Sequence, residues 1–161
     1  MRRALSLAIA GLFVLLASAA QAQAQTITWT ANLNGGQEIP VVVTGSVGTA
    51  TVTWNTSTKT GTYRVDVYNM PVGTTASHIH VGAVGAGGPV VINFTVPAGG
   101  ISNDYGLSGT FACSDVVARP AQGINSCEDF EQAILLDNAY VNVHSTVNAG
   151  GEIRGQLVRQ R

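Results

Sequence analysis

Apolar and polar residues alternate in short stretches along most of the chain after residue 25. Tyr63, Val65 and Val67 share one face of an extended strand, and Arg64 and Asp66 lie on the other. Gly, Pro and Asn separate such stretches, and Thr and Val are frequent within them, which is typical of sheets with many short strands. The pattern predicts an all-β sandwich or barrel with eight strands, at approximately 26–33, 47–55, 61–69, 75–82, 89–95, 105–112, 139–147 and 152–159.

Helical spacing interrupts the alternation once, after Ser126. Ser126 can cap a first turn that carries two acidic residues, where negative charge stabilises a helix N-terminus. Phe130, Ile134 and Leu135, with Ala133 beside them, form an apolar stripe at helical spacing. The segment predicts one short helix over 127–138, with its stripe packed on the core.

The N-terminal segment has the features of a secretory signal peptide. Arg2 and Arg3 precede the apolar run 4–20, and small residues at alternate positions follow as cleavage sites. The run is shorter than the ~20 apolar residues that a spanning helix needs, although a membrane anchor is the alternative. We expect a signal peptide at 1–24, one domain at 25–161, and a periplasmic or secreted protein.

Composition and charge exclude several partners for the segment 25–161. Without Arg2 and Arg3, six basic residues face nine acidic ones. No basic run exists, which disfavours binding to nucleic acid or to an acidic membrane surface. No other segment is long and apolar enough to span a membrane.

Cys113 and Cys127 are the only cysteines. An even number of cysteines in an exported chain predicts one disulfide, with two free thiols as the alternative.

Three histidines are the most informative residues for chemistry. His78 and His80 alternate with Ile79 and Val81, so on a strand they share a face about 6.6 Å apart.

His144 ends another alternating stretch. There Tyr140, Asn142 and His144 share the polar side, and Val141 and Val143 take the core side. If the two strands are neighbours, three neutral imidazoles suit one zinc or copper ion with a fourth position open. The alternative is a hydrogen-bonded polar cluster without metal.

The last stretch adds a second polar row. Glu152, Arg154 and Gln156 alternate with apolar or small residues, and the short turn 148–151 makes this strand a neighbour of the His144 strand. Glu152 and Arg154 form either an exposed ion pair or a polar shell around the imidazoles, with Glu152 accepting a ring proton. Glu38 is either a loop carboxylate or part of the same cluster.

Four ordered segments resemble the CHRD (chordin-type) domain family. They are Asn34–Pro40, His78–Gly82, Tyr140–Ser145 and Gly150–Leu157, and the resemblance covers about residues 27–158. The resemblance implies a single-domain exported member of a family that is widespread in bacterial exported proteins. The chain lacks the cysteine-rich modules of chordin, so growth-factor binding is not carried over.

A weaker resemblance links the chain to Cu/Zn superoxide dismutase. That family also carries a His-x-His pair on a strand of an eight-stranded Greek-key sandwich, and a disulfide tethers one of its loops. The resemblance implies a Greek-key antiparallel fold here, with His78 and His80 matching that pair. The dismutase uses more histidines than this chain has, so at most one histidine-rich metal can bind.

These patterns leave three functions open. The first is a non-catalytic exported binding module that holds one copper or zinc ion, or an extracytoplasmic protein partner. The second is a mononuclear copper oxidoreductase, and the third is a structural or adhesive domain without metal.

Nucleophile motifs and paired catalytic carboxylates are absent, which disfavours triad hydrolysis. The glycine-rich segment 82–88 lacks a phosphate-binding lysine and is predicted to be a turn.

Overall fold

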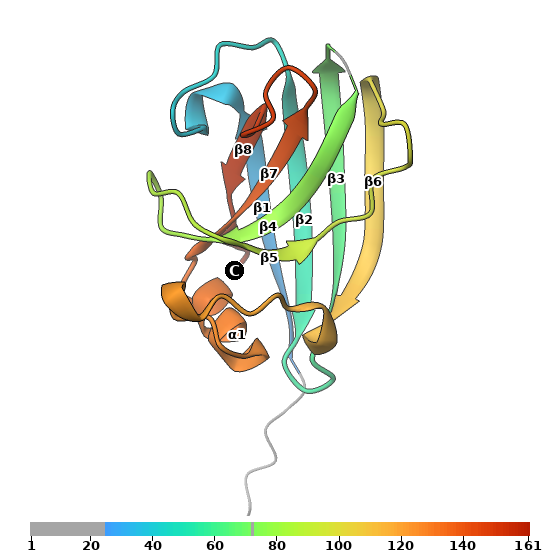
Figure 1. Ribbon diagram of the computed structural model, residues 1–161. Helices are drawn as coiled ribbons and strands as arrows, with labels where there is room; N and C mark the ends of the chain where they lie inside the picture. The colour runs from blue at the N-terminus through green and yellow to red at the C-terminus, as the bar shows by residue number, and fades with distance from the viewer. Residues whose placement is uncertain (1–24, 72) are drawn as a thin grey trace, which may run out of the picture.

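Nine strands and one α-helix make up the protein in a computed structural model that describes residues 25–71 and 73–161 (Figure 1). The strands are β1 (Thr26–Asn34), β2 (Val47–Asn55), β3 (Thr60–Met70), β4 (Thr74–Val81), β5 (Val90–Asn93), β6 (Asn103–Ala112), β7 (Ala139–Ser145), β8 (Ile153–Gln156) and β9 (Val158–Arg159). The helix is α1 (Cys127–Leu135), and the short 3₁₀ turns are η1 (Gly35–Gln37), η2 (Cys113–Asp115) and η3 (Pro120–Gln122).

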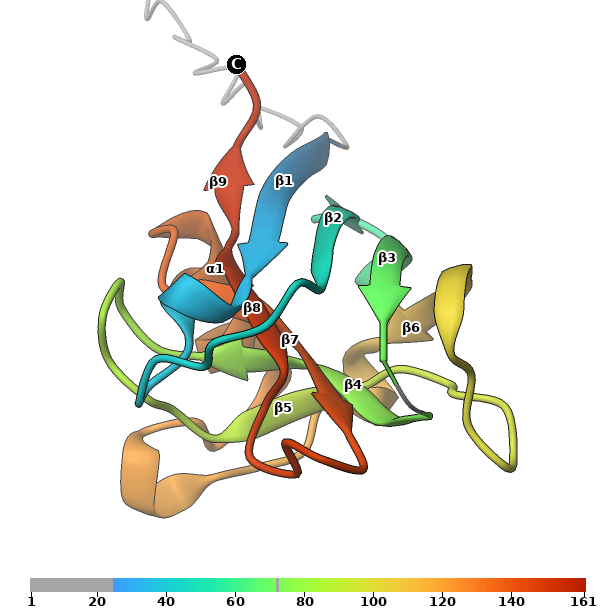
Figure 2. The same ribbon diagram turned by 90° about the horizontal axis from the view of Figure 1, so that it is seen from above.

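The strands form one antiparallel, nearly closed sheet in the order β5-β4-β7-β8-β1-β2-β3-β6, with β9 on β1. The sheet folds over itself, so that β4, β5 and β7 cross in front of β1, β2, β3 and β6 (Figures 1 and 2). The chain crosses from one layer to the other after β3, crosses back after β5, and crosses again after β6 by way of α1. The predicted all-β sandwich or barrel is therefore confirmed.

The last predicted strand, 152–159, is divided in two, which corrects the strand count from eight to nine. Its first part, β8, lies between β7 and β1 and pairs with both, whereas its second part, β9, pairs with β1 alone. The two parts meet at Leu157, whose side chain is fully buried and whose N–H donates to Ala139 O at 3.0 Å.

The helix begins as predicted and ends three residues earlier, which corrects its predicted end at 138. Ser126 and Asp129 form a capping box at its start. At its end Asp137 takes a left-handed conformation with φ 56°. The N–H groups of Asp137 and Asn138 then bond back to Ile134 O and Ala133 O, at 3.1 and 2.9 Å. This Schellman arrangement stops the helix at Leu135 and leads into β7.

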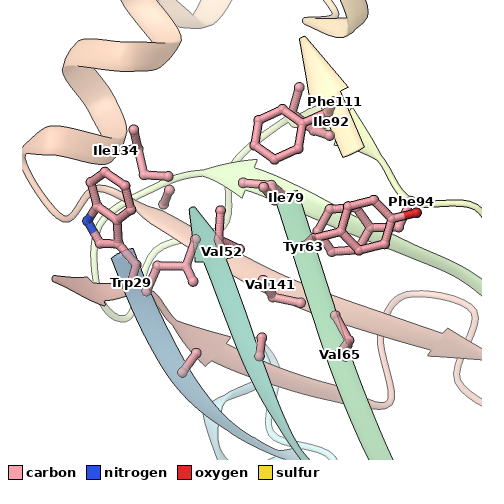
Figure 3. Packing of buried hydrophobic residues seen from close by; sticks show 14 of the residues in the cluster. Trp29, Val52, Tyr63, Val65, Ile79, Ile92, Phe94, Phe111, Ile134 and Val141 are labelled. Carbon is pink, nitrogen blue, oxygen red and sulfur yellow. The ribbon is translucent and has the colours of Figure 1, made fainter. Parts of the chain in front are cut away.

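Aromatic residues fill the end of the barrel that α1 covers (Figure 3). Trp54 stacks on Phe111 with ring centroids 5.6 Å apart and meets the edge of Phe130 at 5.7 Å. Phe130 and Ile134 of the helix are fully buried, so the predicted apolar stripe packs on the core. None of the helices in the described residues is long and apolar enough to cross a membrane.

Cys113 and Cys127 form the predicted disulfide, with Cα atoms 5.2 Å apart. Cys113 follows β6 directly, and Cys127 is the first residue of α1. The bond therefore ties the start of the helix to the end of an edge strand.

Replacing both cysteines by serine should lower the free energy of unfolding by about 3 kcal/mol, since the cysteines lie 14 residues apart and the bond restricts the unfolded chain. Denaturant unfolding of the C113S/C127S variant measures this loss. Reductant should bring the wild type down to the same stability and leave the variant unchanged. Equal stability of the two proteins without reductant would contradict the prediction.

Candidate metal centre

Pairing of β4 with β7 brings the three histidines together. In the antiparallel register His78 lies opposite Asn142, His80 opposite Tyr140, and Ala76 opposite His144. The apolar neighbours Ile79, Val141 and Val143 are fully buried on the other face of the two strands, so the predicted division of faces is correct.

The imidazoles form a compact triangle. His78 Nδ1 lies 3.1 Å from His144 Nε2, and one ring nitrogen of each histidine lies within 4.8 Å of the others. Ring centroids are 4.9 Å apart for His78 and His144, 5.6 Å for His78 and His80, and 6.3 Å for His80 and His144. The expected convergence of histidines from two distant segments is therefore present.

Backbone carbonyls orient two of the rings. His80 Nδ1 lies 2.9 Å from Gly88 O, and His144 Nδ1 lies 2.9 Å from Ala149 O. A carbonyl only accepts, so each Nδ1 carries the proton and each Nε2 keeps its lone pair. The lone pair of His144 Nε2 faces His78 Nδ1 at 3.1 Å. His80 Nε2 is buried and has no hydrogen-bond partner among the described residues. A carbonyl behind a ring is the usual arrangement for a metal-binding imidazole.

Burial keeps the rings neutral near pH 7. It lowers the pKa of both His78 and His80 to about 4, and the nearby His144 adds to the effect on each ring. Burial also lowers the pKa of His144, against the hydrogen bond to Ala149 O. Neutral imidazole is the form that binds a metal ion.

The spacing of the nitrogens fits one ion. Two nitrogens bound to a tetrahedral zinc at 2.0–2.1 Å are about 3.3 Å apart, and the His78–His144 pair is at 3.1 Å. His80 completes the triangle after a shift of about 1–1.5 Å, a distance that a change of side-chain torsion covers. The donor set and its spacing therefore suit a single copper or zinc ion.

Tyr140 supports His80 from the neighbouring strand. The two rings stack with centroids 4.7 Å apart, and Arg154 Cζ lies 3.4 Å from the centre of the Tyr140 ring. Gly88 N donates to the Tyr140 hydroxyl at 3.1 Å. Gly88 must be glycine, because a Cβ there would lie 1.7 Å from Val81 O. The loop 82–88 is thus held in the position that presents Gly88 O to His80.

Glu38 and Asn142 lie beside the histidines in a closely packed contact. Asn142 Nδ2 donates to Glu38 Oε1 at 2.7 Å. Gly151 closes over both, and a Cβ at Gly151 would lie within 2.6 Å of the Glu38 carboxylate and of Asn142 Nδ2. Burial raises the pKa of Glu38 to about 7, against the positive charge of Arg154 and the Asn142 hydrogen bond.

Glu152 is a second buried carboxylate on this face of the sheet, and its hydrogen bonds go to residues other than the histidines. Ser145 Oγ donates to it at 2.8 Å, Asn148 Nδ2 at 2.5 Å, and Thr44 Oγ1 donates as well. Although burial acts to raise its pKa, these donors hold the pKa of Glu152 below its ordinary value. Glu152 ties the segment after η1 to the β7–β8 turn, which carries Ala149 O.

Two backbone carbonyls, those of Gly88 and Ala149, contact the histidines, and the sequence pattern did not identify them. Both come from glycine-rich turns, and a turn signal says nothing about where a carbonyl points. The density of glycine at 82–88 was the one available signal, since it marks close approach of backbone segments.

The domain family follows from a family model for the CHRD domain, which matches residues 29–157. The match covers most of the chain, so the chain belongs to the CHRD domain family. No curated protein and no solved structure matches it significantly.

Replacing Glu38 by glutamine should change how stability depends on pH. Between pH 4.5 and about 7 the unfolded chain loses the Glu38 proton that the folded protein keeps, so this group lowers stability as pH rises through the window. E38Q removes the effect, and its stability relative to wild type should rise by up to about 3 kcal/mol from pH 4.5 to 8.

Denaturant unfolding at several pH values measures the difference between the two proteins. The histidines titrate in both, so they cancel. D66N, a carboxylate replaced on the outer face of β3, serves as control. The prediction would be contradicted if the difference in free energy of unfolding between E38Q and wild type did not change with pH.

Proposed function

We propose that this CHRD domain is an exported binding module that holds one copper or zinc ion through His78, His80 and His144. The observation that carries the proposal is the cluster of ring nitrogens within 4.8 Å of one another, from two strands that are distant in sequence. Metal-binding histidines commonly donate their other ring N–H to a carbonyl, as His80 and His144 do here. The burial that keeps the rings neutral favours metal over protons.

The three nitrogens leave one coordination position for water or an outside ligand. His78 and His144 are only half-buried, so that position faces the solvent side of the sheet. Imidazole nitrogens suit both Cu²⁺ and Zn²⁺. A given nitrogen site binds Cu²⁺ more tightly than Zn²⁺, and the choice between the two depends on availability as well as geometry. An extracytoplasmic protein that supplies the fourth ligand is the kind of partner this position would accept.

The proposed location is outside the cytoplasm, in the periplasm or beyond the cell. The disulfide fits an oxidising compartment. The predicted signal peptide, 1–24, lies outside the described residues and stays a prediction. Export would place the histidines where copper and zinc are not held by cytoplasmic thiols.

Metal binding should be stoichiometric and should depend on each histidine. Tag-free protein treated with chelator and then titrated with Cu²⁺ or Zn²⁺ in a calorimeter is expected to bind one ion per chain. H78A, H80A and H144A should each weaken binding by more than about tenfold, since each removes a ligand. At a free metal concentration 100 times Kd the wild type should gain about 2.7 kcal/mol of stability.

The variant E128Q is the control, because it removes a surface carboxylate on α1 and leaves the histidines intact. It should bind metal like the wild type. Equal metal content in wild type, H78A and H144A would end the proposal. Absence of both binding and a rise in Tm would leave a structural or adhesive role.

A mononuclear copper oxidoreductase is the second candidate, favoured by the open position beside half-buried rings. If it is correct, copper-loaded protein should consume superoxide faster than the same concentration of free copper buffered by a chelator. The activity should be lost in H144A and absent from zinc-loaded protein. A rate at background level would remove this candidate and leave the binding module.

A further inference from the structure

A cavity lies on the same sheet face, on the far side of Asn142 from His78, since Asn142 pairs with His78 on one side and with Arg154 on the other. It has a volume of about 340 Å³ and opens between the segment that follows β1 and the loop that follows β4, which lie near each other over β8 (Figure 2). Its lining includes Glu38, Ile39, Val41, Val84, Arg154 and Gln156. A volume of this size holds a small organic molecule.

Arg154 places a buried positive charge in the wall of this cavity. Only 3% of the residue is exposed. One of its terminal nitrogens, Nη2, donates to Ala86 O at 2.8 Å and to Ala83 O at 3.4 Å. No carboxylate lies within 4.0 Å of its guanidinium in the described part of the chain, where the ion pairs are Lys59–Glu131 and Arg64–Asp66.

A buried cation without a counter-ion is unfavourable, and a guanidinium has five N–H donors in a planar fork. Among the described residues only Nη2 donates hydrogen bonds, to the two carbonyls. The remaining N–H donors of a guanidinium can receive two oxygens of a carboxylate, the geometry for which arginine is suited.

Glu38 is near Arg154 but does not neutralise it. Its carboxyl accepts from Asn142, and burial raises its pKa to about 7 against the field of Arg154. In the protonated form Glu38 offers an O–H donor to a ligand oxygen instead of a competing negative charge. The cavity therefore presents donors from two sides.

The mouth of the cavity is apolar. Ile39 is 49% exposed, Val41 66% and Val84 79%, and all three line the opening. Branched apolar side chains gathered around a polar floor are the usual lining of a site for a ligand with an apolar body and a polar head.

We propose that this cavity binds a small organic carboxylate with a branched or linear apolar body, whose carboxylate pairs with Arg154 and whose body packs against Ile39, Val41 and Val84. The site is separate from the three histidines and does not require a metal ion. It adds a small-molecule ligand to the function proposed above.

Calorimetric titration of the chelator-treated protein with 4-methylpentanoate, 4-methylpentanamide and inorganic phosphate tests the proposal. The carboxylate should bind one per chain and at least about tenfold more tightly than the amide of the same shape or phosphate. Arg154→Gln should abolish the preference for carboxylate over amide. Binding should be unchanged in His144→Ala, which separates this site from the metal centre.

Val84→Asp keeps the test decisive if Arg154→Gln does not fold, because Val84 is a surface residue. The new carboxylate at the mouth should weaken binding of 4-methylpentanoate at least about tenfold by like-charge repulsion. Arg64→Gln and Val158→Asp, on other parts of the surface, are the matched controls and should bind like the wild type. The proposal is wrong if no carboxylate binding is detected, if acid and amide bind equally, or if Val84→Asp binds like the wild type.

Discussion

Antiparallel pairing of β4 with β7 is the interaction on which the rest of the site depends. The two strands are about 65 residues apart in sequence, as the His78–His144 contact shows by its separation of 66. Their register places His78 opposite Asn142 and His80 opposite Tyr140. Because side chains alternate along a strand, this one register sets both faces: Ile79 and Val141 enter the core, and the polar residues gather on the other side.

The polar face is itself largely buried, which distinguishes it from the outer face of an ordinary sandwich. Loops from after β1, after β4 and between β7 and β8 cover it, and His80, Asn142, Glu152 and Arg154 are each at most 9% exposed. Buried polar groups require partners, and here the covering loops supply many of them through their carbonyls. The same contacts hold the loops in place, so ring orientation and loop position are two consequences of one network.

Two buried carboxylates in this network have pKa values shifted in opposite directions because they differ in hydrogen-bond donors. Glu152 receives hydrogen bonds from two hydroxyl residues of the segment after η1, from Ser145 and from Asn148, and stays ionised. Glu38 receives one side-chain hydrogen bond, from Asn142, and its pKa rises to about 7. Burial acts on both in the same direction, so the number of donors decides the outcome. Among the described residues no carboxylate lies within 4.0 Å of the Arg154 guanidinium, which lines an accessible cavity.

The alternation of residues determined most of the fold on its own. Short runs with turn residues between them specified the β class and nearly every strand, and Ser126 specified the start of the helix, because these depend on local periodicity and capping. The even pair Cys113 and Cys127 indicated the disulfide. The split of the last strand at Leu157 and the early end of the helix at Leu135 depend on contacts with other strands and on a left-handed residue, which local patterns do not encode.

The candidate site was only half determined by sequence. The His-x-His spacing placed His78 and His80 on one face of their strand. The positions of Val141 and Val143 placed His144 on the polar face of a second strand, since side chains along a strand alternate with a period of two. Whether those two strands are neighbours depends on the order of strands in the sheet, which is decided by pairing between segments that are distant in sequence. The carbonyls of Gly88 and Ala149 and the position of Arg154 against the cavity were likewise decided by tertiary structure, because backbone direction and burial arise only when the loops pack over the sheet.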